Sequence, residues 1–62
     1  MANNAVWVSL KREDGVYIWV NARKAWLIEP GVPGNSRIVF GDKQNVTVVG
    51  EPGAIARELS PP

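Results

Sequence analysis

The sequence contains no cysteine and no histidine, and these two absences narrow its chemistry. Without cysteine no disulfide can form, and a structural zinc ion would lack its usual thiolate and imidazole ligands. Catalysis by a nucleophile or a general acid and base would depend on scattered carboxylates, serines and lysines. None of these has a second such residue at a spacing that is typical of a catalytic pair. We therefore expect a protein that is not an enzyme and that holds no metal and no cofactor.

Strong charge and long apolar runs are lacking as well. Seven Lys and Arg against six Asp and Glu give a net charge of +1, which is too weak to attract a polyanion by charge alone. No apolar run approaches the roughly 18 residues that span a bilayer, and the first four residues lack the basic start of a signal peptide. These features favour a cytoplasmic chain without membrane insertion, and they make nucleic acid the less favoured partner.

The chain has 62 residues, of which 45% are hydrophobic, and we interpret residues 1–62 as one small β domain. A domain of this size buries only about 60% of the surface that its unfolded chain exposes, so its stability is marginal. Small domains usually compensate with disulfides, a metal or a second subunit. Since the first two are disfavoured here, self-association is the expected reinforcement.

The first third of the chain has the alternating pattern of a β-hairpin. Apolar residues alternate over residues 6–10, and a β-branched and aromatic run follows over residues 16–20. Between them, charged residues end in Asp14-Gly15, a dipeptide that tolerates the positive φ of a hairpin turn. We expect two antiparallel strands joined by this turn.

The rest of the chain predicts three more strands and a helix. A strand over residues 25–29 ends at Pro30, after a polar stretch that has room for one helical turn over residues 22–25. The loop over residues 30–35 holds two Pro-Gly pairs, which suit type II turns. A second hairpin follows over residues 37–49, with Gly41 and Asp42 in its turn. Residues 51–59 place Pro52 in a first helical turn and predict a short helix. The expected fold is mainly β: a five-stranded antiparallel meander, bent or partly closed into a barrel, with a short C-terminal helix.

Both faces of the expected sheet are apolar. A sheet covered on one side by a short helix should be polar on the other, whereas large apolar side chains occupy the outward positions here. The outward set consists of Trp7, Tyr17, Trp19, Trp26, Val39 and Val49. Exposed aromatic patches usually mark interaction surfaces, so we expect a homo-oligomer, or a contact with another protein, through these residues. Curling of the strands into a small barrel would instead bury some of them, and the face of Trp26 is left open.

A second interpretation assigns the basic residues to nucleic acid. Small β-barrels bind single strands by stacking bases on aromatic rings within a basic groove. The candidate contacts are Arg12, Arg23, Lys24, Arg37 and Lys43, which interleave with the tryptophans. The competing interpretation is a solvated charged rim with neighbouring acids.

The order of residues resembles the FlbD-like family of very short bacterial flagellar proteins over roughly residues 6–59. The matching positions are Ser9-Leu10-Lys11-Arg12, Gly15, Tyr17, Val20-Asn21, Ile28-Glu29-Pro30, Arg37-Ile38-Val39-Phe40-Gly41, Val46, Val48, Glu51 and Ile55. The three tryptophans and the proline-rich loop depart from the family pattern. The resemblance implies a non-enzymatic protein that acts in motility through contacts with other proteins, and it supplies no catalytic residues.

Overall fold

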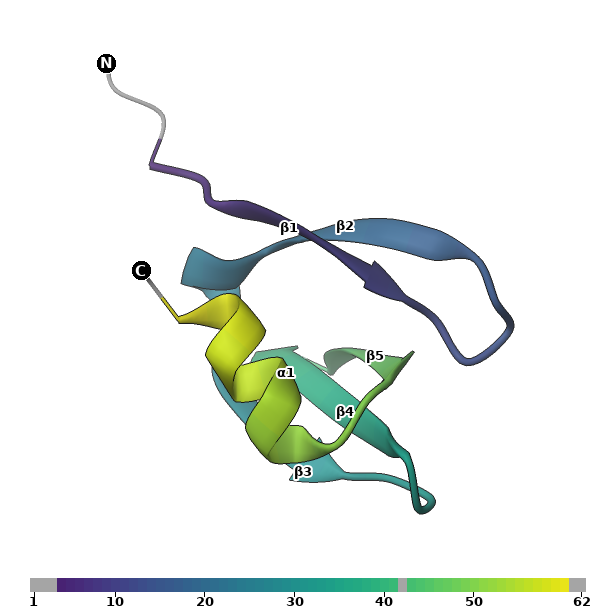
Figure 1. The fold of residues 1–62 in the computed structure, drawn as a ribbon. Helices are drawn as coiled ribbons and strands as arrows, with labels where there is room; N and C mark the ends of the chain where they lie inside the picture. The colour runs from purple at the N-terminus through teal and green to yellow at the C-terminus, as the bar shows by residue number, and fades with distance from the viewer. Residues whose placement is uncertain (1–3, 42, 61–62) are drawn as a thin grey trace.

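The protein is mainly β, with five antiparallel strands in two sheets and a short C-terminal helix (Figure 1). A computed structural model describes residues 4–41 and 43–60. The elements in chain order are β1 (Trp7–Lys11), β2 (Tyr17–Asn21), the 3-10 helix η1 (Ala22–Lys24), β3 (Leu27–Pro30), β4 (Asn35–Gly41), β5 (Gln44–Val49) and α1 (Pro52–Leu59).

Strands β1 and β2 form the expected hairpin. The turn forms at Asp14-Gly15, where Gly15 has a φ of +91° and its N–H donates to the Arg12 carbonyl at 2.9 Å. The Asp14 carboxylate accepts a hydrogen bond from the Val16 N–H at 3.0 Å, which holds the returning chain. The prediction of a hairpin with an Asp-Gly turn is therefore confirmed.

Strands β3, β4 and β5 form an antiparallel meander. The loop before β4 contains the predicted type II turn, because the Asn35 N–H donates to the Val32 carbonyl at 2.8 Å and Gly34 has a φ of +93°. The next connection is tight, since Gly41 at the end of β4 pairs with Gln44 at the start of β5. The predicted turn residue Asp42 lies outside the described residues.

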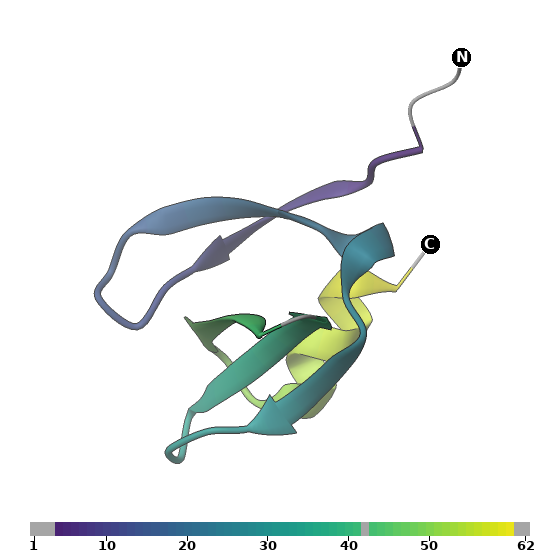
Figure 2. The same ribbon diagram turned by 180° about the vertical axis from the view of Figure 1, so that it is seen from behind.

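The two groups of strands do not form one continuous meander, which corrects the expectation from the sequence. Strands β2 and β3 are not paired, because η1 steps the chain from one sheet to the other (Figure 2). The Asn21 side chain stabilises this step, since its Oδ1 accepts from the Arg23 N–H at 3.1 Å and from the Val6 N–H at 3.0 Å. The sheets meet at one corner, where Arg12 bridges to Val48, and no closed barrel forms among the described residues.

The core lies between the hairpin, the three-stranded sheet and α1. Its fully buried centre is Ile38 and Val48 on the sheet, against which Leu10 and Val20 of the hairpin and Ile55 of α1 pack. The alternation of β1 and β2 in the sequence, with Trp7, Tyr17 and Trp19 outward, therefore agrees with the burial of Leu10 and Val20. The hairpin and α1 cover the same face of the three-stranded sheet (Figure 1), so all three elements share one apolar cluster.

The same substitution, valine to alanine, at two neighbouring positions of β5 tests which side of the sheet is buried. Val48 is fully buried whereas Val49 is 43% exposed on the outward side. We expect Val48→Ala to lower the free energy of unfolding by about 2 kcal/mol, because it leaves a cavity in the shared core. Val49→Ala, the control, should cost less than about 0.5 kcal/mol. Urea denaturation measures both, and equal losses would contradict the assignment of faces.

Candidate interaction surfaces

The outward side of the hairpin carries three exposed aromatic side chains. Trp7, Tyr17 and Trp19 are 58%, 68% and 67% exposed. Because side chains alternate along a strand, these three residues lie on the other side of the hairpin from Leu10 and Val20, whose side chains are buried in the core. We call the outward residues of β1 and β2 the hairpin face, which consists of Trp7, Ser9, Lys11, Tyr17, Trp19 and Asn21.

The register spaces these rings across the hairpin face. Trp19 lies opposite Ser9 and Tyr17 lies opposite Lys11, so neither ring has a large apolar neighbour directly across from it. Trp7 lies opposite Asn21, one step diagonally from Trp19. Since the chain itself covers none of these rings well, the hairpin face is an apolar surface open to a partner.

The structure places Val39 and Val49 on a different surface from the hairpin face. Both lie on the outward side of the three-stranded sheet, where Val39 is half-buried. The two sheets pack inner side against inner side, so their outward sides point away from each other. The six residues predicted as one apolar face are therefore divided between two outward faces and the segment that contains Trp26.

Trp26 lies between η1 and β3 and is 73% exposed. Its backbone N–H donates to the Val39 carbonyl at 2.8 Å, which fixes its place beside the sheet. With Ala22 and Leu59 it lines an open depression of about 360 Å³. Trp26 is therefore not a core residue, and it lies outside the hairpin face.

The basic residues do not gather on one surface. Arg12 forms an ion pair with Asp14 at 2.5 Å, and Arg37 forms one with Glu29 across β3 and β4. The other predicted contacts are Arg23 and Lys24 in η1 and Lys43 in the connection between β4 and β5. Arg23 and Lys24, with Trp26 and Phe40, line a second open depression of about 540 Å³.

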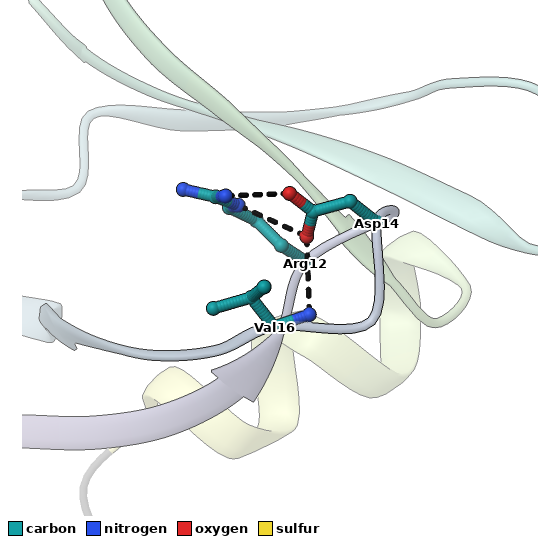
Figure 3. Close-up of polar contacts among 3 residues, drawn as sticks. All are labelled: Arg12, Asp14 and Val16. Carbon is teal, nitrogen blue, oxygen red and sulfur yellow. Dashed lines mark hydrogen bonds and ion pairs between the residues drawn. The ribbon is translucent and has the colours of Figure 1, made fainter.

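The Arg12–Asp14 pair is held by several contacts in one turn (Figure 3). The hydrogen bond from the Arg12 guanidinium lowers the pKa of Asp14 below its ordinary value, and the Val16 N–H lowers it further. The same hydrogen bond and the nearby negative charge raise the pKa of Arg12. The charges of Arg12 and Asp14 therefore compensate each other within the turn.

Sequence reasoning missed the exposure of Val6 and Val16. The alternation of a strand puts them on the same side of the hairpin as Leu10 and Val20, yet they are 45% and 49% exposed. Both lie just outside the ends of β1 and β2, so the opposing layer does not cover them. Their position next to the turn and the strand start is the signal that could have shown this.

Comparison of the chain with protein-family models, with curated proteins and with solved structures gives no match. No helix within residues 4–41 and 43–60 is long and apolar enough to cross a membrane. The same residues contain no cluster of three or more acidic, His or Cys side chains that could hold a metal ion. The hairpin face and the depressions beside Trp26 are thus the surfaces from which a function can be argued.

The lowered pKa of Asp14 predicts a pH dependence of stability. An acid whose folded pKa lies below its unfolded value, about 3.9, stabilises the fold above that value and loses this contribution as the pH falls through the folded pKa. We expect Asp14→Asn to lower the urea midpoint at pH 7 and to flatten its decline below about pH 4.

Glu13→Gln is the matched control, because it removes one negative charge from the same turn and leaves the Arg12–Asp14 contact intact. Its urea midpoint should follow that of the unaltered chain as the pH is lowered. An Asp14→Asn profile with the same acid slope as the unaltered chain would contradict the assigned role of Asp14.

Proposed function

We propose that this chain is a small, non-enzymatic interaction module that self-associates through the hairpin face. The observation that carries the proposal is the exposure of Trp7, Tyr17 and Trp19, each more than half exposed on the same side of a two-stranded sheet. Trp and Tyr are the side chains that most often anchor protein interfaces, and a contiguous exposed apolar patch usually marks such an interface.

The energy available from this face is large relative to the stability of a small domain. Burying an aromatic ring covers 150 to 250 Å² at about 25 cal/mol per Å², so three rings contribute on the order of 10 kcal/mol per chain. Association and the ordering of side chains cost a comparable amount. Because the gain and the cost are of similar size, we expect a reversible association that depends on concentration.

A second copy is the partner that needs no further assumption, because every copy presents the same apolar face. Lys11 is the one charged residue of the hairpin face, so like charges oppose self-contact weakly. Contact with another protein through the same rings is the related form of this proposal. The resemblance to the FlbD-like flagellar family supports it, since that family is expected to act through protein contacts in motility.

The alternative is a partly closed small β-barrel that binds single-stranded nucleic acid. The bridge between Arg12 and Val48 favours partial closure, because it joins the two sheets at one corner. Arg23, Lys24 and Trp26 around one depression combine cations with an exposed ring, which suits base stacking. The two ion-paired arginines weaken this alternative, since their charges are already compensated.

Two single substitutions test self-association. In light scattering, the unaltered chain should have a molar mass of at least twice the monomer mass of 6.8 kDa. Trp19→Ser should shift this mass toward 6.8 kDa, because the anchor ring is lost. Trp26→Ser is the matched control, since it removes an equally exposed indole from another surface. A mass of 6.8 kDa for the unaltered chain at high concentration would refute the proposal.

A titration with nucleic acid distinguishes self-association from the alternative of single-strand binding. Fluorescence anisotropy of labelled single-stranded RNA or DNA at low salt should show no binding at high micromolar protein, because the paired arginines leave a weak field. The double variant Arg23→Ala/Lys24→Ala provides the control. Binding by the unaltered chain that this variant abolishes would favour the nucleic-acid alternative instead.

A further inference from the structure

Strand β2 has one edge with which no strand among the described residues pairs. Its other edge pairs with β1. Edge strands are normally protected by charges, proline or bulges. The five residues Tyr17–Asn21 contain no charge and no proline, and their register with β1 is regular. An edge of this kind is a template for another strand.

The hydrogen-bond pattern of the hairpin shows which backbone groups occupy that edge. The Arg12 N–H donates to the Val16 carbonyl and the Ala22 N–H donates to the Val6 carbonyl, both at 2.8 Å. In an antiparallel pair, residues alternate between those that bond their partner and those that face away. Val16 bonds its partner Arg12, so the next residue, Tyr17, is one of those that face away. Its N–H and C=O therefore point away from β1.

Trp19 follows the same alternation, two residues further along β2. Its backbone groups therefore face the open edge, while its side chain lies on the hairpin face. The residue with the best anchoring side chain is thus also at the middle of the available edge.

The other sheet edges are less suitable. Strand β3 is four residues long and ends in Pro30, which has no N–H to donate. The C-terminal end of β1 is occupied by β5, because Arg12 bridges to Val48 and the Glu13 N–H donates to the Thr47 carbonyl at 3.3 Å. The edge of β2 is therefore the site that can accept a strand along its whole length.

We propose that self-association occurs by antiparallel pairing of β2 with β2 of a second copy, centred on Trp19. Trp19 then lies opposite Trp19 of the second copy, and Tyr17 lies opposite Asn21 of the second copy. This register places the outward backbone groups of the two strands against each other, as a hydrogen-bonded pair requires. The inference rests on the proposed self-association and defines its geometry.

The charges at the two ends of β2 favour this antiparallel arrangement. Glu13, which forms no ion pair among the described residues, precedes the strand, whereas Arg23 and Lys24 follow it. The charge of Asp14 is compensated by Arg12. Antiparallel pairing brings the acidic end of one copy beside the basic end of the other, and a parallel arrangement would bring like charges together. Neither Arg23 nor Lys24 forms an ion pair within the described residues, so both are available to the second copy.

Pairing also extends the apolar surfaces of both copies. The result is a four-stranded sheet whose outward side carries the three aromatic side chains of each copy in one continuous patch. On the inner side, Ile18 lies opposite Val20 of the second copy, so the two cores become neighbours. The contact thereby covers the edge beside the half-buried Ile18 and brings the two Trp19 side chains side by side, while the outward sides of the rings stay open.

Disulfide trapping tests the register, and the absence of native cysteine makes the result clear. Residues directly opposite each other in a hydrogen-bonded antiparallel pair have Cα atoms about 5.5 Å apart, within the range that a disulfide spans. We expect a mixture of Tyr17→Cys and Asn21→Cys proteins to form a 17–21 disulfide between copies on mild oxidation. Each protein alone should cross-link at least tenfold less, because like positions are about 14 Å apart.

Charge reversal provides a second measurement that leaves the strand intact. Glu13→Lys and the double variant Arg23→Glu/Lys24→Glu should each raise the dissociation constant of the dimer several-fold. The combination of all three changes should restore it, because the acidic and basic ends have exchanged places. No recovery in the combined variant would overturn the antiparallel arrangement.

The outcomes separate the two proposals. A dimer that forms no 17–21 disulfide, or one that cross-links equally well through Tyr17→Cys alone, overturns the β2 register and leaves self-association standing. An unaltered chain that stays at 6.8 kDa overturns both. A 17–21 disulfide that forms only in the mixture supports both.

Discussion

The structure depends on the apolar contact between the hairpin and the three-stranded sheet. Ile38 and Val48 are fully buried in this contact, and Leu10, Val20 and Ile55 close around them. Because the side chains of a strand alternate between two faces, using one face of β1 and β2 for the core turns the other face outward. The aromatic rings of the hairpin face are exposed for this reason and not because the chain is loosely folded.

The same division explains why the chain stops short of a barrel. A closed barrel would pair β2 with β3 and would leave no open edge. Asn21 instead holds η1 through its side chain, and the chain crosses to the second sheet before β3 begins. Within residues 4–41 and 43–60, a bridge between Arg12 and Val48 joins the sheets at the opposite corner. The open edge and the apolar face consequently occur on the same strand, β2.

Much of the fold could be predicted because its signals are local. Alternation fixed the inner and outer sides of β1 and β2, and glycine-containing turns such as that at Gly15 fixed where the chain reverses. The separation of β2 from β3 could not be predicted, since it depends on hydrogen bonds that Asn21 Oδ1 accepts from the nearby Arg23 N–H and from the distant Val6 N–H. The separation of Val39 and Val49 from the hairpin rings follows from the packing of two sheets, which alternation within a strand does not specify. The Arg37–Glu29 pair was missed for the same reason, because it forms across two strands.

The central claim is that one chain covers its inner faces alone and binds a second copy through the hairpin, whose strand β2 carries both outward rings and an open edge. Filtered NOE spectroscopy on an equimolar mixture of isotope-labelled and unlabelled chain tests it most directly, because it detects contacts between copies. Pairing through β2 predicts intermolecular contacts at the rings of Tyr17 and Trp19, and none at Val39 or Val49. A spectrum at millimolar concentration without intermolecular contacts at those rings would contradict it.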